Sequence, residues 1–220
     1  EEHKVYLVQS ALSDKVYVQK ILDVYNIRVY EYLYRNPVSG IPRIINYYED
    51  GNQLVVIEEY ISGTSLQEKI DNSDLSVSDI RSYMIMLCNI LEALHSMTPP
   101  IIHRDIKPSN IIITSYNYAM LLDFNAAKQF SGQHESDTVL IDTPGYAAPE
   151  QYGFGSSSPK TDIYSLGIVL REMLGSITLT SDIAPILHRL NLIADRCTQM
   201  TPAARYQSVA ELKNAVSQSY

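Results

Sequence analysis

The chain has 220 residues, which suits one larger domain or two small lobes that share a hinge. Apolar residues make up 45% and charged residues 19%, a balance that supports a packed core and excludes a disordered tail. The 17 basic and 25 acidic residues give a net charge of −8, which argues against nucleic acid or an anionic membrane as the main partner.

The first 60 residues carry mostly strand patterns. Two β-rich runs are separated by a short polar turn, and a later pair of runs meets at Gly51-Asn52, a sequence typical of hairpins. Between the two hairpins, apolar residues recur at helical spacing until Pro37. We expect strands over 4–10 and 15–22, a short helix over 23–36, and a hairpin formed by 43–50 and 53–61.

The pattern becomes helical after a flexible joint at residues 62–66. Short strands interrupt it around 101–114 and 118–124, and they frame a loop. We expect an α+β fold with a small β-rich lobe and hinge over residues 1–61 and a larger helical lobe over 62–220. The expected helices of the larger lobe cover residues 76–97, 162–174, 184–200 and 208–219.

The two cysteines, Cys88 and Cys197, lie in apolar helical patterns and form no CxxC pair, so we expect reduced core residues in a reducing compartment. No apolar run is long enough to span a bilayer, and no signal peptide opens the chain. Because the sequence begins inside a strand pattern, we expect a fragment of a longer protein, whose other segments can include a membrane anchor.

Three motifs follow one another in the helical half: HRDIKPSN at 103–110, an apolar run that ends in DFN at 123–125, and TPGYAAPE at 143–150. In this order they resemble the signature set of the protein kinase superfamily, and most closely a bacterial serine/threonine kinase domain. The resemblance covers nearly the whole chain and implies the two-lobed kinase fold.

The resemblance assigns chemical roles to polar residues of these motifs. It implies that Asp105 orients the substrate hydroxyl or accepts its proton, and that Lys107 lies beside the γ-phosphate of ATP. Asn110 and Asp123 would hold Mg²⁺ through oxygen ligands, and Lys20 would reach the α- and β-phosphates. The expected catalytic residues are Asp105, Lys107, Lys20 and Asn110. The expected ATP-binding residues are Lys20, Val5, Val18, Glu59, Ile61, Ile112 and Asp123, with Tyr60 in the hinge.

Further residues match structural positions of the family. Glu150 and Arg205 correspond to a buried ion pair, and Asp162 to the residue that braces the catalytic loop. Arg104 is the kind of cation that pairs with a phosphorylated activation segment, for which we expect Thr138 or Ser136 to be the phosphorylated residue.

The sequence departs from the family pattern near Lys20. His3 stands where the last glycine of the phosphate-covering loop is expected, and Ile27 stands where a helix glutamate is expected. Two carboxylates remain as partners for Lys20. Glu31 lies one helical turn further on, and Glu58 occupies the usually apolar position behind the adenine pocket. In the second alternative, Glu58 would hold Lys20 in an ordered but inactive arrangement when the helix moves away.

Asn125 replaces the usual glycine of the DFG motif. Asn tolerates a positive φ better than most residues, so we interpret the exchange as an altered hinge and not as a lost metal site.

We therefore expect a cytoplasmic enzyme that transfers phosphate from ATP, with Mg²⁺, to serine or threonine hydroxyls of proteins. A longer, membrane-attached protein stays open as its setting, and the oligomeric state is not predicted. One alternative is a pseudokinase, a nucleotide-binding or scaffold module without transfer activity. A kinase of small molecules is a second alternative, disfavoured by the intact TPGYAAPE segment. The four polar residues Lys20, Asp105, Asn110 and Asp123 favour the enzyme.

Overall fold

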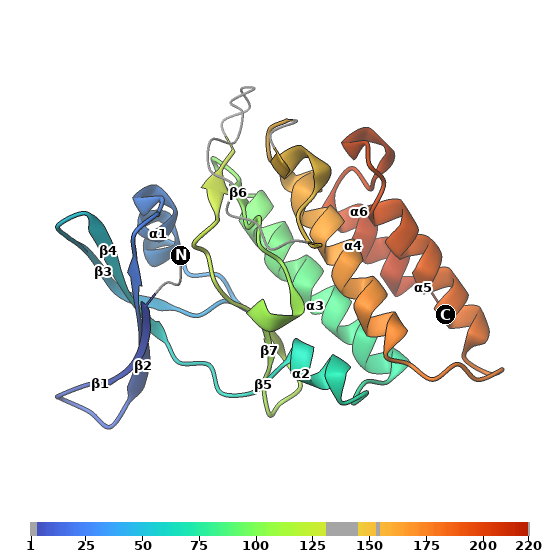
Figure 1. The fold of residues 1–220 in the computed structure, drawn as a ribbon, viewed down its shortest axis with the longest axis horizontal. Helices are drawn as coiled ribbons and strands as arrows, with labels where there is room; N and C mark the ends of the chain where they lie inside the picture. The colour runs from blue at the N-terminus through green and yellow to red at the C-terminus, as the bar shows by residue number, and fades with distance from the viewer. Residues whose placement is uncertain (1–3, 131–144, 153–154, 220) are drawn as a thin grey trace.

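The computed structural model describes residues 4–130, 145–152 and 155–219. A strand-rich part, formed by the beginning of the chain, stands beside a larger helical part formed by the rest (Figure 1). The last strand of the first part ends at Glu59 and the next helix begins at Leu66, so a short segment joins the two parts. This is the α+β architecture that the sequence predicted; the boundary at residue 61 stays a prediction.

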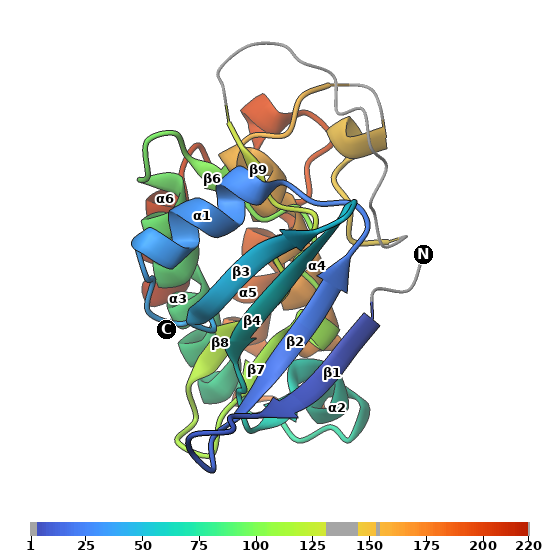
Figure 2. The ribbon, with the colours of Figure 1, turned by 90° about the vertical axis from the view of Figure 1, so that its left-hand side faces the viewer.

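The strand-rich part is one antiparallel sheet with the order β1-β2-β4-β3, which Figure 2 shows face-on. Gly51 connects two of its strands with φ of +60°, a left-handed conformation that glycine adopts without strain. Both predicted hairpins are confirmed. The strands are β1 (Lys4–Gln9), β2 (Val16–Leu22), β3 (Ile44–Asp50) and β4 (Gln53–Glu59).

Helix α1 (Ile27–Arg35) lies at the β3 side of this sheet (Figure 2). It starts four residues later than the pattern predicted because the Asn26 side chain caps it, accepting a hydrogen bond from the Arg28 N–H. Its end lies just before Pro37, which cannot continue a helix. The buried residues of α1 follow helical spacing and form one face: Val29, Tyr30 and Leu33.

The helical part is built from long helices that lie side by side (Figure 1). Two of them begin with capping boxes, Ser76 with Asp79 and Ser158 with Thr161, in which side chains satisfy the first backbone N–H groups. The helices are α2 (Leu66–Asp71), α3 (Val77–His95), α4 (Pro159–Gly175), α5 (Ala184–Cys197) and α6 (Val209–Ser217), and the 3₁₀ turns are η1 (Pro108–Asn110), η2 (Pro149–Tyr152) and η3 (Pro202–Ala204).

Short strands frame two loops at the boundary between the parts. Strands β5, β7 and β8 form one small sheet, and β6 pairs with β9. The Leu121 N–H donates to the Gly40 carbonyl at 2.8 Å, so the backbone after α1 is tied directly to β8. The bounds are β5 (Thr64–Ser65), β6 (Ile101–Ile102), β7 (Ile111–Ile113), β8 (Ala119–Leu121) and β9 (Lys128–Gln129).

Both cysteines are buried free thiols, as predicted. Burial raises the pKa of the Cys88 thiol to about 12 and raises that of Cys197 further, so both stay protonated and inert. Cys197 packs closely against Gly167 of α4: a Cβ added at Gly167 would lie 2.4 Å from the Cβ of Cys197. Among the described residues, no helix combines the length and the apolar character needed to cross a membrane.

A buried ion pair anchors η2 to the helices. Arg205 donates to both carboxylate oxygens of Glu150, at 2.8 and 2.9 Å, and its remaining donors bond to backbone carbonyls. Glu150 also accepts a hydrogen bond from the Thr161 hydroxyl at 2.9 Å. The sequence predicted this pair, and the prediction is confirmed. Because every donor is satisfied, removal of one partner leaves a buried charge without compensation.

We predict that Arg205→Met lowers the free energy of unfolding by about 3–5 kcal/mol, because Glu150 is then buried without a cation. The matched control is Arg171→Met, since Arg171 pairs with Asp195 at 2.7 Å on the surface. Such an exposed pair contributes at most about 1 kcal/mol. Urea unfolding of the three proteins measures both effects. Equal losses in the two variants would contradict the anchoring role of Arg205.

Candidate functional site

Lys20 forms a buried ion pair with Glu58. The sheet register places Val18 opposite Glu58 and Lys20 opposite Val56 on the neighbouring strand. Since alternate residues of a strand share a face, Lys20 and Glu58 point to the same side, diagonally across β2 and β4. Lys20 Nζ lies 2.9 Å from Glu58 Oε1, and both side chains are about nine-tenths buried.

A second carboxylate, Asp123, approaches Lys20 from the helical part. Its Oδ1 lies 3.6 Å from Lys20 Nζ. Burial alone would lower the pKa of Lys20, but the charges of Glu58 and Asp123 outweigh it and raise the pKa above its usual value. Lys20 is therefore a fixed cation that connects the sheet to the end of the buried strand β8.

Glu31 is not a partner of Lys20 in this structure. It pairs with Arg35 at 2.7 Å on the outer face of α1, where its side chain is 40% exposed. Of the two carboxylates that the sequence left open, the structure selects Glu58. The helix has not moved away, because Tyr30 of α1 donates a hydrogen bond to Asn125 at 2.7 Å. The Lys20–Glu58 pair thus exists together with a docked helix, whereas the sequence had associated this pair with a helix that moves away.

Asp105, Lys107 and Asn110 meet in the catalytic loop, residues 103–110. Lys107 Nζ lies 2.8 Å from Asp105 Oδ2. The Asn110 amide nitrogen donates to the Asp105 carbonyl and to its Oδ2, at 3.0 and 2.9 Å. The Asn110 carbonyl accepts a hydrogen bond from the Leu122 N–H at 2.8 Å, one residue before Asp123. The polar motif residues therefore lie on two adjoining loops: Asp105, Lys107 and Asn110 on the first, and Asp123 on the second.

Asp123 and Asn110 have the chemistry of a magnesium site. Asp123 Oδ1 is buried and accepts no hydrogen bond from the residues that the structure describes. Its nearest cation is Lys20, whose Nζ lies 3.6 Å away, beyond hydrogen-bond distance, so the lone pairs of this oxygen stay available to a metal ion. Since the Asn110 nitrogen bonds to Asp105, its amide oxygen is the atom left for a ligand role. Carboxylate and amide oxygens are ligands that Mg²⁺ accepts, so the donor set fits this ion.

Asp162 of α4 braces the catalytic loop. It is fully buried and accepts hydrogen bonds from the backbone N–H groups of His103 and Arg104, both at 2.9 Å. His95 Nε2 lies 2.8 Å from the same carboxylate. Burial by itself would raise the pKa of Asp162, but these partners outweigh it and lower the pKa. The bracing holds Arg104 at φ of +71°, a conformation that costs free energy for any residue except glycine.

His103 links the catalytic loop to the loop that follows β8. Its Nε2 lies 3.0 Å from the Leu122 carbonyl, and its Nδ1 accepts a 3.4 Å hydrogen bond from the Asp105 N–H. These partners fit a neutral ring with the proton on Nε2. Burial lowers the pKa of His103, although the nearby carboxylates of Asp162, Asp105 and Asp123 oppose this shift. No role for His103 followed from the sequence, because its partners are backbone groups that no residue pattern reveals.

The predicted adenine-binding residues lie on strands β1, β2, β4 and β7 and on the segment that follows β4. Val5 stands opposite Lys20 on β1, and Val18 stands opposite Glu58. Glu59 uses its N–H for the Arg43 carbonyl at 2.9 Å. Tyr60 and Ile61 follow β4, and Ile112 of β7 pairs with Ser65. Gly63 passes close to β7, because a Cβ added there would lie 2.3 Å from the Ile113 carbonyl oxygen and 2.7 Å from the Ile112 side chain. The chain that follows the hinge therefore packs against Ile112.

Several predictions concern residues outside the described ranges. These are His3 and the expected phosphorylation sites Ser136 and Thr138, which stay predictions. The Asn125 prediction is wrong in its reason, because the positive φ in this loop belongs to Asp123, at +67°. Asn125 instead contributes its side-chain oxygen as an acceptor.

The two-part fold and the two polar loops have the arrangement of a protein kinase domain. A family model described as "Protein kinase domain" matches residues 4–218, and the chain therefore belongs to this family. The chain is 30% identical over 199 residues to serine/threonine-protein kinase D of Synechocystis, an alignment that covers 81% of this chain and 38% of the relative. It is 33% identical over 151 residues to the receptor-like protein kinase At3g21340 of Arabidopsis thaliana, covering 66% and 17%. The chain thus spans much less than two thirds of these relatives.

We predict that His103 makes stability depend on pH. The unfolded chain takes up a proton at His103 below the ordinary value of 6.5, whereas the folded ring resists protonation because its pKa is lowered. Its contribution to stability is therefore present above pH 6.5 and is lost as the pH falls toward the folded pKa, with a slope of up to about 1.4 kcal/mol per pH unit.

Urea unfolding between pH 7.5 and 5 measures this slope. His103→Gln should show a shallower decline than the wild-type protein. The control His188→Gln, at an exposed histidine, should keep the wild-type slope. Identical slopes in all three proteins would contradict the buried neutral ring.

Proposed function

We propose that the chain transfers the γ-phosphoryl group of ATP to serine and threonine hydroxyls of protein substrates. The observation that carries this proposal is the meeting of the Asp105–Lys107–Asn110 cluster with Asp123 and Lys20. Phosphoryl transfer needs placement of two reactants and compensation of phosphate charge, and this cluster supplies anions for a metal and cations for phosphates.

Asp105 is the residue that orients the attacking hydroxyl and accepts its proton. Lys107, held 2.8 Å from Asp105, places a positive charge where the γ-phosphate would meet that hydroxyl. Asn110 and Asp123 would hold Mg²⁺, which supplies compensation for the charge of the phosphate oxygens. Lys20 contacts the α- and β-phosphates, and the Glu58 carboxylate keeps its ammonium group in place.

We propose that adenine binds between Val5, Val18 and Ile112, with the backbone of Glu59 and Ile61 as its hydrogen-bonding edge. The Glu59 N–H is already bonded to the Arg43 carbonyl, so we propose the Glu59 carbonyl as the acceptor for the base. Behind adenine, the Lys20–Glu58 ion pair replaces the usual apolar wall. We also propose a cytoplasmic location, because ATP is the substrate and both cysteines are free thiols.

We predict that Asp105→Asn lowers phosphate transfer by about 10²–10⁴-fold, the usual contribution of a general base. Binding of Mg-ATP should stay close to wild type, and at a hundredfold excess over Kd it should stabilise either protein by about 2.7 kcal/mol. Radiolabelled phosphate incorporation into a generic protein substrate measures transfer, and thermal unfolding measures binding. The control is Asp182→Asn, at an exposed carboxylate of the helical part.

Three outcomes separate the candidates. Transfer and binding in the wild type, with transfer lost in Asp105→Asn, supports the kinase. Binding of Mg-ATP without any transfer in the wild type would make the chain a nucleotide-binding module. Full transfer in Asp105→Asn would refute the assigned role of Asp105.

We predict that Glu58→Gln lowers kcat/KM for ATP by at least about tenfold, or about 1.4 kcal/mol, whereas Glu31→Gln changes it less than about twofold. Without the Glu58 charge, the buried Lys20 has Asp123 as its nearest carboxylate and is drawn toward the metal ligand. Both variants make the same chemical exchange, so steady-state kinetics compares the two positions directly. A larger loss in Glu31→Gln would mean that Glu31 becomes the partner of Lys20 during turnover.

A further inference from the structure

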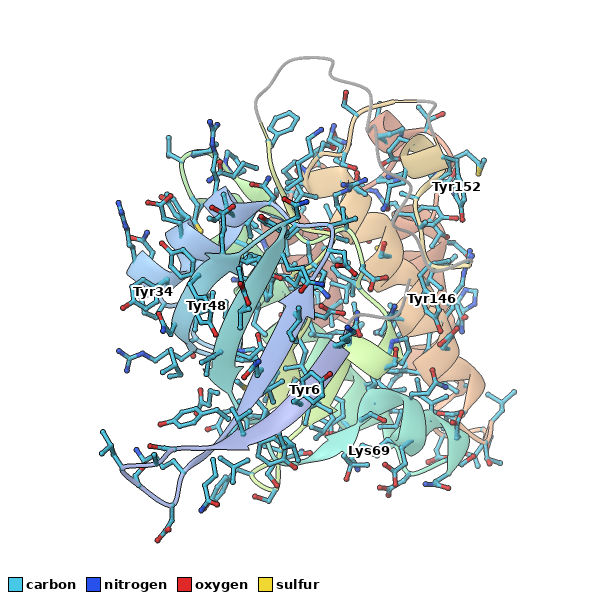
Figure 3. The ribbon with its side chains drawn as sticks, turned by 60° about the vertical axis from the view of Figure 1, so that its left-hand side comes forward. Tyr6, Tyr34, Tyr48, Lys69, Tyr146 and Tyr152 are labelled. Atoms are coloured by element: carbon cyan, nitrogen blue, oxygen red, sulfur yellow. The ribbon has the colours of Figure 1, made fainter. Side chains whose placement is uncertain are left out.

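The α1 side chain that reaches the functional site is the phenol of Tyr30 and not a carboxylate. Tyr30 is 2% exposed, and its hydroxyl donates to Asn125 Oδ1 at 2.7 Å. Other tyrosines of the strand-rich part, such as Tyr34 and Tyr48, lie on its surface with their rings outward (Figure 3). Tyr30 therefore reaches a partner 95 residues away in the chain and on the other part of the fold.

The hydrogen bond has a fixed direction. Burial raises the pKa of Tyr30 well above its usual value, and the charges of Asp123 and Glu58 raise it further. The phenol is thus a permanent donor and needs a neutral or anionic acceptor. Glycine, the residue that the family usually has at position 125, offers no side-chain acceptor. The structure therefore gives a reason for Asn125 that does not involve its backbone conformation.

Asp123 lies between two attachments. On its N-terminal side, Leu122 bonds to the Asn110 carbonyl and to His103. On its C-terminal side, Asn125 is held by Tyr30. Asp123 itself has φ of +67°, a conformation that a non-glycine residue keeps only when its surroundings enforce it. One of these two attachments belongs to the catalytic loop, and the other belongs to α1.

We propose that the Tyr30–Asn125 hydrogen bond is the link through which α1 positions the metal-binding carboxylate of Asp123. In this chain the link takes over the coupling that a helix carboxylate paired with Lys20 would give. Tyr30 and Asn125 are positioning residues, since they act on the metal site through Asp123. The inference rests on the proposed function, in which Asp123 holds Mg²⁺.

The test measures metal affinity directly. Mn²⁺ accepts the same oxygen ligands as Mg²⁺ and is detected by electron paramagnetic resonance. It is titrated into the protein in the presence of a saturating non-hydrolysable ATP analogue. Tyr30→Phe and Asn125→Ala should each raise the Mn²⁺ concentration at half saturation by about fivefold or more. The double variant should show no more than the larger single effect, because both substitutions remove one bond.

The chain offers a matched control. Tyr83 of α3 is also buried, and its hydroxyl also donates to an asparagine oxygen, that of Asn117. Tyr83→Phe removes the same kind of hydrogen bond away from the metal loop. It should lose stability in urea as Tyr30→Phe does, yet bind Mn²⁺ like the wild type. This comparison separates positioning of Asp123 from a general loss of stability.

Each result decides a different question. Unchanged Mn²⁺ affinity in Tyr30→Phe, in a wild-type protein that binds Mn²⁺ with the analogue, would overturn the link and leave the proposed function intact. Additive effects in the double variant would also overturn it, because the two residues would then act separately. A wild-type protein that binds no Mn²⁺ with the analogue would refute the metal site, and with it both the proposed function and this inference.

Discussion

The buried ammonium group of Lys20 is the constraint on which the rest of the site depends. A charge that is nine-tenths buried is tolerated only with a carboxylate in contact, and the helix beside the sheet supplies none. The partner comes from the neighbouring strand, where Glu58 lies 2.9 Å away. Asp123 adds a second, more distant anion from the helical part. The two parts of the fold are thus joined through one cation, at the place where phosphates would bind.

This arrangement changes what α1 has to do. Since Glu58 already holds Lys20, Glu31 can turn to the surface and pair with Arg35. The inward face of the helix is left to Tyr30, which bonds to the loop that carries Asp123. In the helical part, Asp162 accepts hydrogen bonds from two backbone N–H groups of the catalytic loop, and His103 of that loop contacts the Leu122 carbonyl. Asp105 is therefore held through the catalytic loop by α4, whereas Asp123 is held both by the catalytic loop and by α1.

The sequence predicted the parts of the site that depend on local spacing. The resemblance to the family placed Glu58 behind the adenine pocket as one of two possible partners of Lys20, and the motifs placed Asp105, Asn110 and Asp123 in one site. The sequence could not decide between Glu31 and Glu58. Successive residues of a helix point about 100° apart, so a modest rotation of the helix about its axis decides whether Glu31 faces Lys20 or the solvent, and the residue pattern does not fix that rotation. It missed Tyr30, whose hydroxyl finds its partner only after both parts have packed. It also explained Asn125 by backbone conformation, although its amide oxygen is what the structure uses.

The coupling between Lys20 and Glu58 is measured most directly by a double-mutant cycle on the free energy of unfolding, without nucleotide. The variants are Lys20→Met, Glu58→Gln and the double substitution, compared by urea unfolding at neutral pH. For a buried pair in contact, the sum of the two single losses should exceed the loss in the double variant by about 1–3 kcal/mol. Losses that add to within about 0.5 kcal/mol would contradict an ion pair that organises the site, because independent positions add within that range.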